Sequence, residues 1–283
     1  REMGVAAPRC VHVRLLVNGE FSGVYTLVEQ IDGRFADYNF DDGSGNVYKE
    51  VWPLRGNGQP WPEQTYKDAL KTNEEEANVE IFKSFAEELS ASTDGNVKTV
   101  IEKYMDVDQA LKYCVVDRVI KHDDGPFHWY CGGPECSPHN FYFYENPTTS
   151  KVQIVPWDLD HSFTNYTSPN TVTLIPDAWG EITNNCQPYA NGFFGLQQKS
   201  AACDKLVNGL VQYENEFEQL KESFIQGPIS QSAVDALLAQ WQAQINESTD
   251  TANQIHGSDA ISVGQWQAAV SELKTGLSIA RAN

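Results

Sequence analysis

The feature that most constrains the fold is a pair of short apolar runs with polar residues at one end. HNFYFY at His139–Tyr144 places Asn140 at the start of one predicted strand, and VPWDLDHSF at Val155–Phe163 places Asp158 and Asp160 at the end of the next. Strands are rigid, and the turn after a strand exposes its side chains. Because oxygen ligands suit hard divalent cations, the pattern predicts a metal site of the kind that binds beside a phosphate.

The order of the other elements indicates the fold class. Asn18-Gly19 lies between two β-rich runs, Cys10–Val17 and Val24–Ile31, which is a strong hairpin signal. The later strands, Phe141–Tyr144 and Val152–Val155, lie between segments of helical periodicity. Segregated strands and helices predict an α+β fold. The predicted helices begin at Glu74 (ending at Asp94-Gly95), at Tyr104 (to Lys121, with Asp106 and Gln109 as a capping box), and then cover Lys205–Phe224, Ser232–Ile245 and Ser262–Ile279.

The charge balance excludes some classes of partner. Of the 283 residues, 20 are Lys or Arg and 39 are Asp or Glu, so the formal net charge is −19. Proteins bind nucleic acid through cationic side chains, so no nucleic acid is expected as a partner. No apolar run approaches the ~18–20 residues that cross a bilayer, and no membrane span is predicted. A nucleotide site in so acidic a chain requires metal ions or local cations.

The cysteines and two glycosylation patterns favour an extracytoplasmic protein. There are six cysteines, and Cys131 and Cys136 flank a Gly-Gly-Pro turn, which makes them the best candidates for a disulfide. Asn165-Tyr-Thr and Asn246-Glu-Ser are acceptor patterns for N-glycosylation. As an alternative, His128 and His139 could join the two cysteines in a zinc site, although the spacing matches no standard one.

The turn after the helix Tyr104–Lys121 adds two carboxylates, Asp123 and Asp124, and Gly125 ends the helix there. Asn140 and Asp158 follow in the chain. Phosphoryl transfer uses these parts in this order: a carboxylate accepts the hydroxyl proton, and an Asn and an Asp hold the metal ions beside the phosphates. The residue types and their order therefore favour phosphoryl transfer.

At this point the chain resembles a known family, the CotH (spore coat protein H) kinases. The resemblance covers roughly Arg1 to Phe163 and is carried by four motifs, VNGEFSGVYTLVEQID at Val17–Asp32, GNVYKE at Gly45–Glu50, HNFYFY and PWDLDHSF. It implies an atypical protein-kinase-like fold with a helical large lobe. It also implies transfer of the ATP γ-phosphoryl to a protein hydroxyl with Mg²⁺ or Mn²⁺, in a secreted, cell-surface or spore-coat setting. Related surface proteins of some fungi are adhesins.

The resemblance also assigns roles to residues. Asp124 matches the catalytic-loop Asp, with Asp123 as the other choice. Asn140 and Asp158 match the metal-holding Asn and Asp, and Asp158 is thereby essential to catalysis. Asp160 is expected as a further metal ligand. The predicted nucleotide contacts are the backbone from Glu29 to Ile31, which resembles the hinge beside adenine, and Lys49 as a substitute for the phosphate-binding Lys. Residues 1–52 then form the remaining small-lobe strands and hinge, and residues 53–283 the large lobe.

Two departures from the family pattern leave alternatives open. Asp124 and Asn140 lie sixteen positions apart, which is much farther than in the kinase loop, so Pro126–Pro138 is interpreted as an insertion. The family usually has a segment upstream of Arg1 that supplies the first small-lobe strands and a phosphate-binding Lys. If that segment is missing, a pseudokinase or a non-catalytic surface or adhesion module is the alternative. A glycosyltransferase that uses Asp158-Leu159-Asp160 and Mn²⁺ ranks last, because the chain shows no βαβ units.

Overall fold

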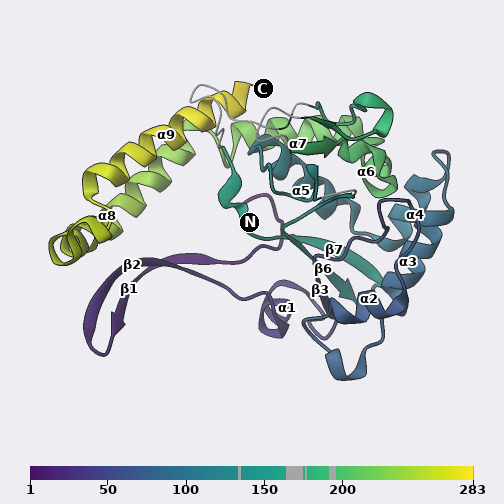
Figure 1. Ribbon diagram of the computed structural model, residues 1–283, viewed down its shortest axis with the longest axis horizontal. Helices are drawn as coiled ribbons and strands as arrows, with labels where there is room; N and C mark the ends of the chain where they lie inside the picture. Colours follow the sequence, from purple (N-terminus) through teal and green to yellow (C-terminus); the bar gives the residue numbers. More distant parts are fainter. Residues whose placement is uncertain (133–134, 164–174, 176, 191–195, 283) are drawn as a thin grey trace.

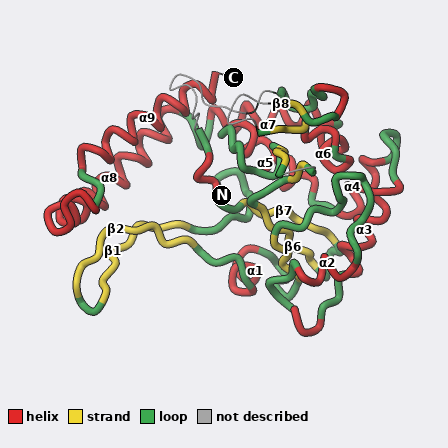
Figure 2. The backbone as a smooth tube through the Cα atoms, viewed as in Figure 1, coloured by secondary structure: helices red, strands yellow, loops and turns green. Residues whose placement is uncertain are grey.

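The computed structural model describes residues 1–132, 135–163, 175, 177–190 and 196–282. Figure 1 shows a main body built from a small sheet covered by helices, and beside it a long hairpin with a pair of helices. Helices are combined with sheets whose described strand pairs are all antiparallel, which is consistent with the predicted α+β class, although strands and helices alternate along much of the chain. The same arrangement can be followed in the backbone trace of Figure 2.

The central sheet is antiparallel and has the order β3-β6-β7, formed by Asn46–Lys49, Phe141–Asn146 and Lys151–Pro156. Alternate residues of a strand face opposite sides. Phe141, Phe143 and Ile154 face the large helical core, whereas Tyr142 and Val155 face a smaller cluster. This smaller cluster is completed by Ile31 and by residues of α1 (Gly33–Asn39). The sheet is therefore buried on both sides.

Helices cover one face of this sheet. The helices α3 (Glu80–Ala91), α4 (Val97–Tyr104) and α5 (Val107–Val119) pack on one another, on the sheet, and on α6 (Lys205–Val211) and α7 (Glu214–Gln226). Asp106 caps α5 as predicted, since its Oδ1 accepts the Gln109 N–H at 3.2 Å. The Gln109 side chain does not complete the capping box, because it donates to the Ile154 carbonyl at 2.6 Å. The cap thus ties the start of α5 to the sheet. The short helix α2 spans Glu63–Asp68.

The predicted N-terminal hairpin forms β1 (Cys10–Val17) and β2 (Glu20–Val28), which pair only with each other among the described strands. It projects from the main body toward the helices α8 (Gln231–His256) and α9 (Val263–Ala282) (Figure 1). Arg14 donates to the Ser248 hydroxyl of α8 at 3.0 Å, and many apolar residues of the hairpin are exposed. A pocket of about 640 Å³ lies between β1, β2 and α8.

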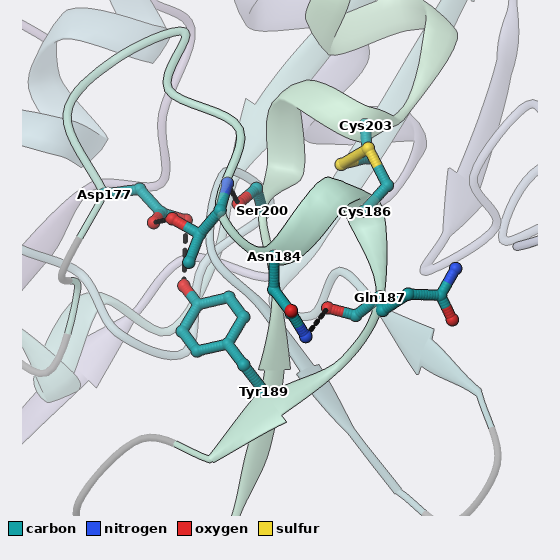
Figure 3. Close-up of a disulfide and its surroundings, with 8 residues drawn as sticks. Asp177, Asn184, Cys186, Gln187, Tyr189, Ser200 and Cys203 are labelled. Carbon is teal, nitrogen blue, oxygen red and sulfur yellow. Dashed lines mark hydrogen bonds between the residues drawn. A yellow bond between two sulfur atoms is a disulfide. The ribbon is translucent and has the colours of Figure 1, made fainter.

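A four-stranded sheet has the order β5-β4-β9-β8, and Tyr130 of its strand β4 contacts Asp124 in the turn after α5. Its strands are short: Trp129–Cys131, Cys136–Ser137, Gln197–Lys199 and Tyr189–Ala190 for β4, β5, β9 and β8. The predicted disulfide between Cys131 and Cys136 is confirmed, and it closes the β4–β5 turn. A second disulfide, Cys186–Cys203, was not predicted (Figure 3). The zinc alternative is wrong, because both of its cysteines are consumed by the first disulfide.

Several predicted boundaries were wrong. The residues Glu74–Glu76 form a separate 3-10 turn, and α3 begins only at Glu80. The predicted helix Lys205–Phe224 is broken at Gln212 into α6 and α7. The predicted helix Ser232–Ile245 continues as α8 to His256, so Asn246 lies exposed on that helix, and Asn165 lies outside the described residues. The division into two lobes at residue 52 stays a prediction. Strand β3, which precedes residue 52, pairs with β6, which follows it. No described helix has the length and apolar character of a membrane span.

Candidate phosphotransfer site

The geometry of the site begins with a buried pair at the end of α5. Asp117 and His122 have fully buried side chains, and His122 Nδ1 lies 3.0 Å from Asp117 Oδ2. The other ring nitrogen, Nε2, lies 3.1 Å from the backbone carbonyl of Asp158. Both nitrogens thus face acceptors, which suits the protonated imidazolium. Burial lowers the pKa of His122, but the hydrogen bond and charge of Asp117 raise it by more, so the net shift is upward.

Gly125 packs directly on this pair. A β-carbon at position 125 would lie 2.3 Å from Asp117 Oδ2 and 2.5 Å from His122 Nδ1. Buried polar groups lose stability when their partners are displaced, so neither neighbour can move away cheaply. The turn after α5 therefore requires glycine for close approach rather than for a positive φ.

The two adjacent carboxylates of the turn differ in their surroundings. Asp123 is buried, its N–H donates to the His161 carbonyl at 3.3 Å, and its Oδ1 lies 3.5 Å from His161 Nδ1. Burial is the main reason that the pKa of Asp123 is raised. Asp124, by contrast, is half-buried. The turn thus joins Asp123 to the segment after β7 and leaves Asp124 closer to solvent.

Asp124 and Asn140 are in direct contact, although sixteen residues separate them in the sequence. Asn140 Nδ2 donates to Asp124 Oδ2 at 2.6 Å and to the Asp124 carbonyl at 3.0 Å. The Asn140 N–H donates to Glu50 Oε1 at 3.1 Å, and Asn140 has a left-handed backbone with a φ of 55°. The Tyr130 hydroxyl donates to Asp124 Oδ1 at 2.7 Å. The insertion therefore folds back beside the turn and does not separate the two residues.

Asp158 lies at the same end of the central sheet as Asn140. Phe141, the first residue of β6, pairs with Pro156, the last residue of β7, so the residues flanking these ends are neighbours. Asp158 is exposed, has a φ of 53°, and its side chain does not cap the 3-10 turn η2 (Leu159–His161) that follows. Asp160 is exposed on that turn. His122, through the Asp158 carbonyl, links the two acidic segments.

The residues predicted to contact nucleotide occupy two places. Ile31 is buried in the small cluster beside the sheet, which Trp157 also contacts. The Lys49 ammonium lies 5.9 Å from the centre of the Tyr142 ring, and that ring packs at 5.7 Å against Trp157, the neighbour of Asp158. Glu29 lies at the base of the hairpin, where Arg9 pairs with its carboxylate and lowers its pKa. Lys49 and Ile31 thus share the Trp157 side of the sheet, and Glu29 pairs with Arg9 directly after β2.

The side-chain oxygen atoms of Asn140 and Asp158 suit a divalent cation that is also bound by phosphates better than a cation that is coordinated by protein atoms alone. Within the described residues, no three His, Cys, Asp or Glu side chains gather as a metal cluster. Magnesium is commonly held by one or two carboxylates together with substrate phosphates and water. Since Asp124 engages the Asn140 amide nitrogen, the Asn140 amide oxygen remains for a cation, and the exposed carboxylate of Asp158 follows the strand end that pairs with the start of β6.

Two pockets of the structure lie away from Asp124, Asn140 and Asp158. The pocket of about 640 Å³ is between the hairpin and α8, and another of about 480 Å³ is lined by residues such as Asn39, Asp106 and Gln153. Neither lining includes Asp124, Asn140 or Asp158.

Sequence reasoning missed several residues of the site. The sequence patterns predict no role for His122, Asp117, Tyr130 or Glu50. His161 has no predicted role, yet its Nδ1 lies 3.5 Å from Asp123 Oδ1. A polar residue within an apolar helix stripe, such as Asp117, could have signalled a buried pair, because buried carboxylates need a partner. Glu50 and Tyr130 carry no such local signal.

Comparison with known proteins agrees with the motifs. The family model described as "CotH kinase protein" matches residues 1–278, which extends well beyond the part covered by the motifs. A search of curated proteins found no match. Because the family model matches nearly the whole chain, the protein belongs to the CotH kinase family.

Proposed function

We propose that this chain is an atypical protein kinase that transfers the γ-phosphoryl group of ATP to a protein hydroxyl with the help of Mg²⁺ or Mn²⁺. The observation that carries the proposal is the contact between Asp124 and Asn140, at 2.6 Å, beside an Asp158 backbone held by His122. Family membership supports it independently. A kinase-like arrangement of two lobes is part of the same proposal.

Each residue has a role that suits its surroundings. Asp124 accepts the proton of the acceptor hydroxyl, since it is half-buried yet reachable. Asn140, through its amide oxygen, and Asp158 hold the divalent cation, and Asp160 adds a carboxylate on the same turn. A bound cation neutralises charge on the phosphates. Lys49 is the candidate for a cationic phosphate contact, and the backbone near Glu29 and Ile31 for the adenine contact.

The decisive test replaces Asp158 with alanine and measures phosphate transfer from radiolabelled ATP to a general acceptor such as casein. The variant is expected to lose the activity, while its melting temperature stays close to that of the wild type because the side chain is exposed. The matched control is Asp108→Ala, since Asp108 is an exposed aspartate of α5 paired with Lys112. Activity that survives in the Asp158 variant rules out the proposed site.

A second candidate function is a non-catalytic surface or adhesion module. The observation that favours it is the projecting hairpin, on which Val11, Leu16 and Leu27 are each more than half exposed beside a pocket lined with apolar residues. Thermal unfolding with ATP and Mn²⁺ separates the two functions, because a ligand that binds the folded state raises the melting temperature. A rise that requires both ATP and metal argues for the kinase, and no shift at saturating concentrations argues for the module.

The location that fits the chain best is extracytoplasmic. The two disulfides, Cys131–Cys136 and Cys186–Cys203, are typical of oxidising compartments, and Asn246 is an exposed glycosylation acceptor. Mass spectrometry of the protein purified from its source, without reduction, tests this: both disulfides should be present, and free thiols at these positions would contradict it.

A further inference from the structure

The structure shows which hydroxyl reaches the proposed general base. The Tyr130 hydroxyl donates to Asp124 Oδ1 at 2.7 Å, while Asn140 donates to the other carboxylate oxygen. Asp124 therefore lies between a phenol and an amide that we assign to the cation site. We propose that Tyr130 occupies the acceptor position of this site and is phosphorylated by its own chain. This inference rests on the proposed kinase function.

Three contacts hold the phenol in place. Tyr130 belongs to β4, which pairs with β5 on one side and β9 on the other. Its ring stacks on the His139 ring, with centroids 4.2 Å apart and an angle of 9° between the planes. The disulfide Cys131–Cys136 closes the hairpin that begins at the next residue. A hydroxyl held at a fixed place beside a base reacts more readily than one that must first find it.

Other tyrosines also donate to carboxylates, but their partners lack the same surroundings. Tyr189 donates to Asp177 at 2.9 Å (Figure 3), and Tyr213 donates to Glu102 at 2.9 Å. Asp124 differs from these carboxylates because it also binds Asn140, at the end of the sheet where Asp158 is exposed. A tyrosine–carboxylate pair alone thus does not define the position, and the neighbouring Asn and Asp do.

The reaction balances without any further reagent. The phenolic O–H bond breaks and its proton passes to Asp124, while the phenolic oxygen forms a bond to the γ-phosphorus of ATP. The bond between that phosphorus and the β–γ bridging oxygen breaks, and ADP leaves with the electron pair. Burial, followed by the hydrogen bond to Asp124, raises the pKa of Tyr130, so the phenol carries its proton until this step and needs the base.

Phosphorylation also changes the site. A phosphate ester carries a charge of about −1.5 to −2 at neutral pH. The negative charges of Asp124 and of the exposed Glu50 repel the phosphate, so the modified Tyr130 side chain moves away from Asp124. The acceptor position is then free for a hydroxyl from another protein.

The experiment incubates the whole chain with ATP and either Mg²⁺ or Mn²⁺, and locates phosphate by peptide mass spectrometry. Phosphate is expected on Tyr130 and should be absent in Tyr130→Phe and in Asp124→Asn. The matched control is Tyr189→Phe, which removes another tyrosine–carboxylate pair and should leave the Tyr130 phosphate unchanged. Parallel assays follow phosphate transfer to casein.

The casein assay separates this inference from the proposed function. If neither casein nor the chain is phosphorylated, the kinase proposal fails and this one with it. If casein is phosphorylated and Tyr130 is not, only the self-phosphorylation is wrong. Tyr130→Phe should raise transfer to casein by about tenfold when the assay begins with unmodified protein, a factor that corresponds to one hydrogen bond to a charged group. A fall instead means that Tyr130 merely positions Asp124.

A binding measurement provides a readout that does not depend on turnover. ADP with Mg²⁺ and aluminium fluoride imitates the phosphoryl group in transfer, and an acceptor oxygen completes the complex. The wild type and Tyr189→Phe should therefore gain more thermal stability from this mixture than Tyr130→Phe gains. Equal gains in all three proteins would show that the phenol does not face the transferred group.

Discussion

The polar groups at the two ends of strand β6 differ in burial and in their hydrogen-bond partners. Near one end, Glu145 is only 4% exposed, and it accepts hydrogen bonds from the Tyr48 hydroxyl, the Asn46 amide and the Phe82 N–H at 2.8, 3.0 and 3.0 Å. At the other end, Asn140 contacts Asp124, and Asp158 is exposed nearby. A carboxylate with all its partners inside the protein stabilises the fold, whereas an open one remains available for chemistry.

Among the changes that test this contrast, Asp124→Asn should have the largest effect, on the rate of phosphate transfer. The substitution keeps the shape of the side chain but removes the base, so the rate of phosphate transfer should fall by about 10²–10⁴-fold. Initial rates with radiolabelled ATP measure the loss. The melting temperature should fall only modestly, because the new amide oxygen can still accept from Tyr130 and Asn140 Nδ2 keeps the Asp124 carbonyl, although it loses the side-chain acceptor. A variant that keeps more than a tenth of the wild-type rate would show that the open end of β6 supplies no general base.

At the sealed end, Glu145→Ala should lower the free energy of unfolding by about 3 kcal/mol. It leaves the Tyr48 hydroxyl and the Phe82 N–H buried without an acceptor, and such groups cost about 1–3 kcal/mol each. Urea denaturation measures the loss, and the exposed Glu87→Ala of α3 is the control that should change almost nothing. Loss of phosphate transfer from a protein that remains folded would contradict a purely structural role.

The disulfide Cys131–Cys136 lies near the Asn140 end of β6. Its removal should lower the free energy of unfolding by less than Glu145→Ala does. Replacing Cys131 and Cys136 with serine opens a loop whose ends are 5 positions apart, which should cost about 2 kcal/mol. The Cys186–Cys203 link spans 17 positions and should cost about 3 kcal/mol when it is removed in the same way. Denaturation of the two double variants checks the order, and the reverse order would mean that strain or residual structure outweighs loop length.

The smallest expected effect is a pH dependence at the sealed end. Burial raises the pKa of Glu145 above its usual 4.5, and the hydrogen bonds from Tyr48, Phe82 and Asn46 only partly oppose the rise. The folded state therefore holds this proton more tightly than the unfolded state does. The resulting stabilisation is complete below pH 4.5 and is lost as the pH rises through the folded-state pKa.

Glu145→Gln removes that dependence, because the amide does not titrate. Melting temperatures at pH 4.5 and 7.5 should show the variant gaining on the wild type at the higher pH. A constant difference between the two proteins would mean that the pKa of Glu145 is the same in both states.

Local patterns in the sequence predicted the strands and helices well where one face is regularly apolar. The hairpin from Asn18-Gly19, the pair β6–β7 and the cap at Asp106 were all predicted. The break at Gln212 was not, because the apolar stripe continues from α6 into α7 while the chain changes direction. The α1 helix was also missed, since its seven residues are too few to show a period.

For the site, the sequence supplied the polar residues but not their contacts. The contact between Asp124 and Asn140 depends on an insertion that folds into β4 and β5, and loop closure of this kind leaves no local periodicity. Asp117 lies in the last turn of α5, and His122 lies just beyond the end of that helix. The contact between His122 Nε2 and the Asp158 carbonyl joins residues 36 positions apart. The roles of Asp124, Asn140, Asp158, Asp160 and Lys49 stay predictions until activity is measured.

The close packing of Gly125 on Asp117 and His122 has a consequence for any survey of variants of this chain. Replacing every position in turn and selecting for soluble protein should return glycine alone at 125, even in cells that do not depend on the protein's activity. At Gly132, seven residues later, an added β-carbon meets nothing within 4 Å, and most side chains should be accepted. Intolerance at 125 would thus mimic the signature of a reactive group, although the residue has no side chain with which to react.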